Sequence, residues 1–506
     1  MMAGNSLTSG RNIVSPVQLN RASLTRLQPP VQVPGFDLSR VTPGIVHLGL
    51  GGFHRAHMAR YMHNLMERRP DMLQWGIVGA GLMPSDRRMH ESLAPQDNLY
   101  TLVERSFTDE TATVIGSLAA VVFAGESSAA LLDVIDRPEI RIVSLTVTEN
   151  GYCLNRSTKR LDPAHTLILA DLARPEQPSS AVGIIVEAYR RRRDGGARPF
   201  TALSCDNIQH NGTVLRDAVL ALAGLRDPAL AEWIEQHGSF PSTMVDRITP
   251  VTADTDVAGL VERYGIVDRW PVFSETFKQF VIEDRFLAGR PAWEEVGAQF
   301  VDDVAPYEFM KLRLLNASHL AVSGMGRLAG YVTIDEAMAD PLVTRFMTVL
   351  MDRETGPTLP PVPGIDLARY KATLVERFAN PAIKDTVERV NTDAPLNVLV
   401  DPIRDRLRAG GSVELLGLAL AAWLRRVRGE DEQGQPIDIR HPLAGLLRER
   451  AIEGGADPRP LLGIIQLFGD SGADPRLIAP VGRWLASLYA KGSRETLAEA
   501  SRTLGF

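Results

Sequence analysis

From about residue 44 the chain alternates short apolar runs with helical patterns, and this alternation limits the possible folds more than any other feature. The run at 45–50 (IVHLGL) ends in glycines, and a helical pattern follows in which Ala59, Met62, Leu65 and Met66 recur at helical spacing. Further short runs lie at 75–80, 113–115, 141–147 and 200–204. Short apolar strands separated by helices are typical of α/β proteins, in which helices cover both faces of a mainly parallel sheet.

After about residue 300 strand signals become scarce and helical patterns dominate. We expect helices over 305–330, 340–353, 365–379, 411–428 and 480–500. The run at 356–364 (GPTLPPVPG) should form a loop, because proline lacks an N–H donor and clashes with the preceding helical turn. We therefore predict an α/β domain over 1–300, of which 1–25 form a loose extension, and a mainly helical domain over 301–506.

Composition excludes several classes of protein. A length of 506 residues allows two or three domains, and the net charge of −6 (55 − 61) lacks the basic excess of a dedicated nucleic-acid binder. Two cysteines, Cys153 and Cys205, rule out a disulfide scaffold and a four-thiolate zinc site, and they fit a reducing cytoplasm. No apolar run approaches the ~20 residues of a membrane helix, and no secretory signal is evident at the start. We expect a cytoplasmic protein without nucleic-acid or membrane partners.

A glycine-rich turn joins the first predicted strand to the first helix. Gly49, Gly51 and Gly52 stand there, and glycines let the backbone approach a pyrophosphate closely while the helix N-terminus offers free N–H groups. The alternative is a plain glycine turn without a ligand. The strand before it and the helix after it favour a dinucleotide site, and hence a Rossmann-type domain.

Such a site also needs an acidic residue after the second strand, to hold the ribose hydroxyls of the adenosine. Asp71 has the usual spacing of about 20 residues from the glycines but precedes the predicted strand at 75–80. Asp86 follows that strand, so we prefer it, although it could also be a solvated loop carboxylate. Arg87 and Arg88 beside it would tolerate a 2′-phosphate, so NADP remains an alternative to NAD.

The segment 307–319 (YEFMKLRLLNASH) carries the most chemistry. In an α-helix, Lys311, Asn316 and His319 would lie at roughly 0°, 140° and 80° around the axis, on one broad face with Leu312 and Leu315. A lysine on such an apolar face loses hydration, which lowers its pKa toward that of a general base for an alcohol. The alternative is a lysine that snorkels from a buried helix, with the asparagine and histidine satisfied in the core.

Two further polar positions follow predicted strands or turns. Asn207 lies in the run SCDN at 204–207, which ends a predicted strand, and open parallel sheets bind ligands at such ends. Asp246 lies in the segment MVDRIT at 244–249, which by itself indicates only a turn that contains an acid.

Taken together, these motifs resemble the mannitol dehydrogenase family of long-chain polyol-specific dehydrogenases. The resemblance covers roughly residues 20–500, and the matching segments follow the order of the family: 45–57, 141–153, 204–212, 244–249, 270–286 and 303–319. It implies metal-independent, NAD-dependent oxidation of a polyol to a ketose, with mannitol and fructose as the first pair to consider. It also implies a small-molecule substrate and a monomer or small homo-oligomer.

The resemblance also assigns roles to individual residues. Lys311 matches the catalytic base, Asn207 and Asn316 match the asparagines that bracket the reacting oxygen, and Glu308 matches the acid that gates proton release. His319 matches a histidine that helps to hold the substrate.

The other matching positions contact substrate or cofactor. Asp246 and Arg389 match substrate-contacting positions. Asp86 matches the acid that favours NAD, and Phe53 belongs to the matching glycine turn.

Two departures from the family pattern bear on specificity. Where the family usually has an Asp-Gly-Ser-Ser-Lys run, this chain has DAPLN at 393–397, so Asn397 replaces a lysine that reaches the substrate. Ser85 stands where close relatives often have a second acid before Asp86, which weakens the discrimination against NADP.

The alternatives within the enzyme class are an arabinitol or sorbitol dehydrogenase and a fructuronate or tagaturonate reductase. A carboxylate substrate would favour more positive charge, which the loss of the lysine at Asn397 opposes. A zinc polyol dehydrogenase would need ligands around His54 and His57, for which no cysteine and glutamate set is evident. A non-catalytic NAD-binding regulator would lack the lysine, asparagine and histidine set, which this chain retains.

Overall fold

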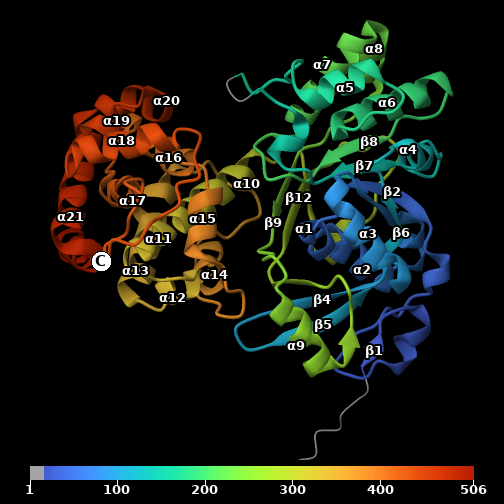
Figure 1. Cartoon of the computed structure of the whole chain (residues 1–506), viewed down its shortest axis with the longest axis horizontal. Helices are drawn as coiled ribbons and strands as arrows, with labels where there is room; N and C mark the ends of the chain where they lie inside the picture. The colour runs from blue at the N-terminus through green and yellow to red at the C-terminus, as the bar shows by residue number, and fades with distance from the viewer. Residues whose placement is uncertain (1–15, 156–157) are drawn as a thin grey trace, which may run out of the picture. The chain divides into compact units, whose positions relative to one another are not determined.

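The structure is a computed structural model that describes residues 16–155 and 158–506 (Figure 1). Its contacts divide the chain into two compact units, the first ending at Asp302 and the second spanning Asp303–Phe506. Unit 1 is an α/β unit built on a parallel sheet and unit 2 is helical, so the predicted fold class is confirmed.

The expectation of a loose extension over 1–25 is wrong for its last part, whereas 1–15 lie outside the described residues. Strand β1 (Val17–Gln18) pairs in parallel with β10 (Ile266–Val267). A 3-10 helix, η1 (Arg21–Arg26), follows, and the side chain of Asn20 caps it. The pairing of β1 with β10 bridges more than two hundred residues of sequence, so local composition does not reveal it.

The central sheet of unit 1 is parallel throughout, in the order β6-β3-β2-β7-β8. Its strands are β2 (Pro43–Leu48), β3 (Gly76–Gly81), β6 (Leu118–Phe123), β7 (Ile142–Leu145) and β8 (Thr201–Ser204). Four of them match predicted strands, but the run at 113–115 does not. It belongs to β5 (Glu110–Ile115), which pairs antiparallel with β4 (Tyr100–Arg105) in another sheet. Gly116 and Ser117 separate β5 from β6 within a nearly continuous apolar stretch, which conceals the turn between them.

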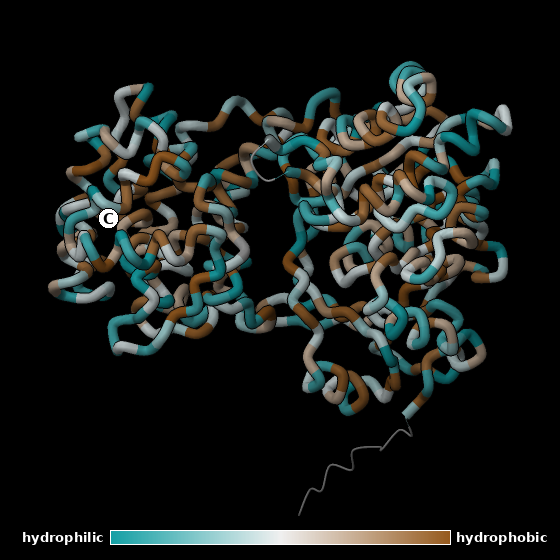
Figure 2. Tube along the Cα trace, turned by 45° about the horizontal axis from the view of Figure 1, so that its top comes forward, coloured by the Kyte–Doolittle hydropathy of each residue, from teal (hydrophilic) through white to brown (hydrophobic). Residues whose placement is uncertain are grey.

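Alternating side chains of the central strands pack against helices on both faces. Val46 and Leu48 of β2 belong to one buried cluster, with residues of α4 (Ala129–Ile135) and α6 (Ala181–Asp194). Ile45 belongs to the cluster on the opposite face, with residues of α2 (Met58–Arg68). In Figure 2 hydrophobic segments gather inside each unit, whereas hydrophilic segments predominate along its outer loops.

Smaller sheets and further helices complete unit 1. The sheet order β11-β4-β5 adds β11 (Val272–Glu275), and the order β13-β12-β9 adds β9 (Thr243–Asp246), β12 (Gln279–Glu283) and β13 (Gln299–Val301). The remaining α-helices are α1 (Gly52–Ala56), α3 (Arg87–Leu93), α5 (Thr166–Ala173), α7 (Asn211–Arg226), α8 (Pro228–His237) and α9 (Asp254–Tyr264). Short 3-10 helices are η2 (Leu38–Arg40), η3 (Pro70–Trp75), η4 (Pro84–Asp86), η5 (Ala94–Gln96), η6 (Glu149–Tyr152) and η7 (Trp293–Val296).

Unit 2 is built around α17 (Glu414–Arg426), which packs against α11 (Ala317–Leu328) and α21 (Pro475–Leu504). The other α-helices are α10 (Ala305–Met310), α12 (Ile334–Met338), α13 (Pro341–Leu350), α14 (Leu367–Phe378), α15 (Val387–Asp393), α16 (Asn397–Arg408), α18 (Ala444–Gly454), α19 (Arg459–Leu462) and α20 (Ile465–Phe468). The proline-rich run contains a 3-10 turn, η10 (Gly356–Thr358), and then a loop; a further 3-10 helix is η11 (Gly469–Ala473).

Two segments that we expected as regular α-helix contain π-helix instead. They are η8 (Lys311–Asn316) and η9 (Met351–Thr355). Each follows an α-helix directly, so the hydrophobic spacing on either side still indicates a helix and hides the wider turn.

Candidate functional site

A cavity of about 680 Å³ opens in unit 1 at the carboxyl ends of β2, β3 and β7. Parallel sheets with helices on both faces bind ligands at this edge. The cavity lining includes all five residues that the sequence assigned to a cofactor: Gly49, Gly51, Gly52, Phe53 and Asp86. The predicted dinucleotide residues therefore surround one pocket.

The three glycines of the turn serve different purposes. Gly49 has φ +91°, and a Cβ there would lie 2.2 Å from the carbonyl oxygen of Thr146, so this position needs glycine. A Cβ on Gly51 would meet only the oxygen of Gly49 at 4.0 Å, which leaves room for a ligand to approach the backbone. A Cβ on Gly52 would instead touch the side chain of Val272 at 3.6 Å.

Two helices follow the turn: a short one, α1, which the sequence did not indicate, and α2, which carries the helical pattern of Ala59, Met62, Leu65 and Met66. α1 ends at Ala56 and α2 begins at Met58, because His57 has φ −110° and ψ −93°. The Nε2 atom of His57 lies 2.8 Å from the carbonyl oxygen of Gln279 on β12. This contact between distant segments accompanies the break.

Asp86 lies on η4 directly after β3, at the pocket. Its Oδ2 accepts a hydrogen bond of 2.9 Å from the Met83 N–H, which shapes the loop at the end of the strand. Asp71 lies on η3, before β3, and pairs with Arg69 at 2.7 Å. The structure therefore places Asp86 and not Asp71 at the pocket, as the sequence reasoning preferred.

The two arginines beside Asp86 have neighbours of their own. Arg87 forms an ion pair with Glu126, and its guanidinium lies 4.7 Å from the ring centre of Phe123. The guanidinium of Arg88 lies 5.4 Å from the ring centre of Trp270. Arg88 and Trp270 both line the pocket.

Two predicted substrate residues of unit 1 stand near the carboxyl ends of their strands. Asn207 lies just past the end of β8 and is exposed, whereas Asp246 is the last residue of β9 and is buried. Asn211 ties the two ends together, since its Nδ2 donates to the carbonyl oxygens of Asp206 and Thr243, both at 2.9 Å.

The predicted catalytic residues of unit 2 lie on one continuous helical segment, but its geometry differs from the expected one. The π-helix η8 starts at Lys311 and ends at Asn316, and the Ala317 N–H donates to the carbonyl oxygen of Leu312, five residues back. Because a π-turn spans an i to i+5 step, Asn316 falls about one turn above Lys311, not roughly 140° away as in an α-helix. Such turns are frequent at functional sites.

Three ionisable side chains of this segment are buried. Lys311 and His319 are each 8% exposed and Glu308 is 5% exposed. His319 follows on α11, where its ring lies 4.3 Å from the ring of Phe378. Buried ionisable side chains gathered on one helical segment mark a functional-site candidate.

Asp385 is a member of this group that the sequence reasoning missed. Its carboxylate accepts from Arg389 at both oxygens, at 2.6 and 2.5 Å, and its Oδ2 lies 3.5 Å from Nε2 of His319. The structure therefore brings His319 and Arg389 together through one buried carboxylate. The i, i+4 spacing of Asp385 and Arg389 was the available signal.

Zinc ligation at His54 and His57 finds no support in the arrangement of their rings. His54 stacks on His47 with ring centres 3.4 Å apart, whereas His57 contacts Gln279. Within residues 16–155 and 158–506, no group of three or more His, Cys, Asp or Glu side chains is arranged to hold a metal ion. In the same described part of the chain, no helix combines the length and apolarity needed to cross a bilayer.

Fold and pocket together define the class of this protein: a Rossmann-type dinucleotide-binding unit is followed by a helical unit with a buried lysine. Residues 43–295 match the Rossmann domain of mannitol dehydrogenases, and residues 303–489 match their C-terminal domain. The chain therefore belongs to the mannitol dehydrogenase family, and it is an oxidoreductase that acts on CH–OH groups.

Individual relatives resemble the chain over nearly its whole length. Mannitol 2-dehydrogenase of Aspergillus fumigatus is 40% identical over 498 residues, which cover 96% of this chain and 99% of the relative. Among solved structures, Pseudomonas fluorescens mannitol 2-dehydrogenase in ternary complex with NAD and D-mannitol has a TM-score of 0.86 at 43% identity, covering 96% of this chain and 99% of that one. A D-sorbitol dehydrogenase in substrate-free form also gives a TM-score of 0.86, at 35% identity, over 95% and 100% of the two chains.

Proposed function

We propose that this protein catalyses the reversible NAD-dependent oxidation of a polyol to a ketose, with D-mannitol and D-fructose as the preferred pair. The observation that carries the proposal is the π-turn that starts at the buried Lys311 and ends at Asn316. The Pseudomonas fluorescens relative in complex with NAD and D-mannitol, at 43% identity, supports the choice of cofactor and substrate.

The dinucleotide pocket fits NAD by its shape and by its acid. The open side of Gly51 would take the pyrophosphate against the backbone, and Asp86 would accept hydrogen bonds from the ribose hydroxyls. A carboxylate at that point also repels a 2′-phosphate, and Arg87 already pairs with Glu126. NAD is therefore the preferred cofactor over NADP. When bound, it supplies the hydride acceptor for the carbinol carbon.

The protein's own residues manage the proton and the charge on oxygen. The Nζ of Lys311 accepts the hydroxyl proton of the polyol as general base. Asn207 and Asn316 donate their amide N–H groups to the alkoxide-like oxygen, a task suited to preorganised dipoles. Glu308, on the helix directly before the π-turn, passes the proton from the lysine toward solvent.

The remaining polar residues hold the polyol chain. Asp246 accepts hydrogen bonds from substrate hydroxyls, and His319 and Arg389 bind further hydroxyls from unit 2. Asp385 restrains both of the latter side chains, since it contacts Nε2 of His319 and pairs with Arg389. A metal ion is not needed for any of these steps.

The assignment of the base is tested with Lys311→Ala. General bases contribute about 100- to 10,000-fold to rate, so we expect kcat to fall by about that factor across pH 6–10. Lys371→Ala is the matched control, because Lys371 lies on α14 and pairs with Asp352 at 2.7 Å. Turnover of Lys311→Ala near that of the wild type throughout this pH range would show that another group is the base.

The substrate is tested by initial rates of oxidation of mannitol, arabinitol and sorbitol with NAD or NADP, and of reduction of fructose and fructuronate with NADH or NADPH. The similarity to a D-sorbitol dehydrogenase makes sorbitol the second candidate. Asn397 is exposed at the start of α16 and offers no charge to a carboxylate, so fructuronate should be poor. Fructuronate as the only good substrate would overturn the polyol assignment.

A further inference from the structure

A buried carboxylate precedes the exposed Asn207 in the chain and faces the segment that follows β7. Asp206 is 6% exposed, and it accepts hydrogen bonds from the N–H groups of Val147 at 3.2 Å and Thr148 at 2.7 Å. It also accepts from the Tyr152 hydroxyl at 2.8 Å. All three donors belong to one segment, so a single side chain holds that segment at three points.

The segment held by Asp206 forms a wall of the dinucleotide pocket and is strained. Thr146, Val147, Thr148 and Gly151 all line the pocket. Thr148 has φ 62° and ψ 170°, a region that is essentially restricted to glycine. A β-branched residue persists in such a conformation only where its surroundings fix it, and the adjacent bonds to Asp206 do so.

The same strand end is tied to β9 on its other side. Asn211 Nδ2 donates to the carbonyl oxygens of Asp206 and Thr243, both at 2.9 Å, and its Oδ1 accepts from the Thr243 N–H at 2.9 Å. The Thr243 hydroxyl donates to the Ser204 carbonyl at 2.7 Å. The pocket wall, the strand end just before Asn207 and the strand that ends in Asp246 thus share one buried network.

We propose that Asp206 is a positioning residue, which locks the strained cofactor wall at 146–151 in place and fixes Asn207 relative to it. This inference rests on the proposed function, because it assigns the wall to the cofactor and Asn207 to the reacting oxygen. Asp206 itself touches neither. Its burial raises the pKa of its carboxyl, while the hydrogen bonds from Tyr152, Val147 and Thr148 oppose that rise.

Asp206→Asn tests the lock with almost no change of shape. The amide nitrogen is a donor where the carboxylate accepted, so at least one backbone N–H of the wall loses its partner. We expect the Kd for NADH to rise about tenfold, because the strained wall at Thr148 is no longer held at three points and relaxes away from the shape that binds the cofactor. We also expect kcat to fall, because Asn207 is displaced.

Thr148→Gly in the Asp206→Asn background distinguishes positioning from general stability. Glycine adopts φ 62° without support, so the double variant should regain most of the NADH affinity. Glu354→Gln is the matched control: Glu354 is another buried carboxylate, which accepts from the N–H groups of Leu415 at 3.0 Å and Leu416 at 2.7 Å in unit 2. It should lower the Tm without changing the Kd for NADH.

The outcomes separate this inference from the proposed function. NADH titration followed by fluorescence reads the wall directly, even if no polyol is turned over. A folded Asp206→Asn variant with wild-type Kd and kcat would overturn the proposal, and so would a raised Kd that Thr148→Gly does not restore. If Asp206→Asn does not fold, Tyr152→Phe removes one of the three bonds, and an unchanged Kd for NADH in that variant would also overturn the proposal.

Discussion

Gly→Ala substitutions at the three glycines of the first turn can separate an effect on dinucleotide binding from an effect on stability, because each adds a single methyl group at a different place. Gly51→Ala is the informative change. Gly51 has φ −79°, which alanine adopts readily, and its new Cβ would meet nothing nearer than the oxygen of Gly49 at 4.0 Å. The folded protein should therefore tolerate the methyl group, which would project into the pocket.

The size of the effect follows from this geometry. Gly→Ala at an unstrained position changes the free energy of unfolding by about 0.4–1 kcal/mol, in the stabilising direction. A methyl group that is forced against a bound pyrophosphate should weaken binding by about 1–3 kcal/mol, the cost of adding a methylene group to a packed protein core. That range raises the Kd for NADH about 5- to 150-fold. Gly51→Ala should thus weaken binding while its Tm stays at or slightly above that of the wild type.

Two neighbouring variants serve as controls. In Gly52→Ala the Cβ lies at ordinary contact distance from Val272 and Thr249, at 3.6 and 3.7 Å, on the protein side of the turn. Its Kd for NADH should stay within about threefold of the wild type, because the methyl group adds little strain. In Gly49→Ala the Cβ would lie 2.2 Å from the Thr146 oxygen at φ +91°, so the Tm itself should fall.

Titration of NADH by fluorescence and thermal denaturation of each variant provide the two measurements. Gly51→Ala should lose affinity for NADH but not stability. Wild-type affinity in a fully folded Gly51→Ala variant would refute it, because the dinucleotide would then not lie against this backbone. Equal losses of affinity in Gly51→Ala and Gly52→Ala would refute the assignment of the open side.

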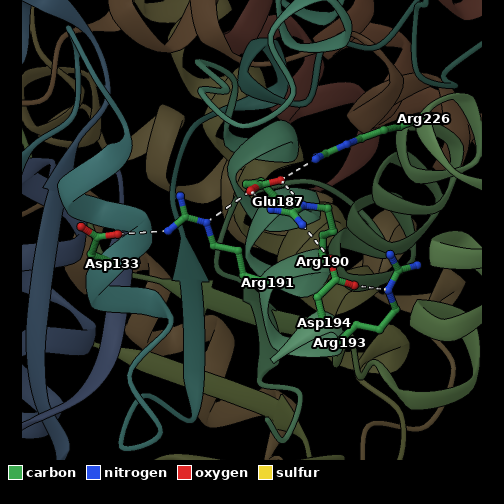
Figure 3. Close-up of polar contacts among 7 residues, drawn as sticks. All are labelled: Asp133, Glu187, Arg190, Arg191, Arg193, Asp194 and Arg226. Carbon is green, nitrogen blue, oxygen red and sulfur yellow. Dashed lines mark hydrogen bonds and ion pairs between the residues drawn. The ribbon is translucent and has the colours of Figure 1, made fainter. Parts of the chain in front are cut away.

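Two further predictions concern stability. Glu187 of α6 is fully buried among arginines (Figure 3); burial raises its pKa, but the hydrogen bonds and charges of Arg190 and Arg226 lower it overall. Glu187→Gln should therefore reduce the free energy of unfolding by about 3 kcal/mol, measured by chemical denaturation, with an unchanged Kd for NADH. Burial lowers the pKa of His47 and His63 to about 3. The unfolded chain protonates these rings first, below about 6.5, so stability should be complete above that pH and fall toward pH 3, by at most about 5 kcal/mol for each ring. His63→Asn should flatten this profile, and an identical slope would contradict the reasoning.

The strands and helices that could be predicted from the sequence are those marked by a local pattern. The apolar runs that became β2, β3, β7 and β8 each end within a few residues of a glycine or polar turn, so both their type and their order were predictable. β6 was missed because it follows β5 after only two residues in the same apolar stretch. Short pieces such as β1 depend on a partner far along the chain, which no local pattern encodes.

The residues of the candidate site also fall into those that local sequence predicts and those that depend on the fold. Gly51 follows from the glycine pattern of the first turn, and Asp86 from its place after the second predicted strand, although the usual spacing pointed to Asp71; both Gly51 and Asp86 line the pocket. The π-turn after Lys311 was not predictable, because the residues on either side keep helical spacing and only the backbone bonding changes. Asp206 and Asp385 were missed because a buried acid gains its meaning from the groups that face it, which the fold supplies.

Two residues that line the pocket, Gly49 and Thr148, have positive φ, and they are stabilised in this conformation in different ways. Gly49 meets the requirement with glycine and needs no support. Thr148 meets it with a residue that disfavours the conformation, so the wall holds its shape only while Asp206 holds Val147 and Thr148. A glycine at 148 would remove the strain, and the wall would then keep its shape without support from Asp206. Because Asp206 supports Thr148, the shape of the cofactor wall depends on the end of β8, which Asn207 follows. A shift of that strand end would therefore displace the cofactor wall and Asn207 together.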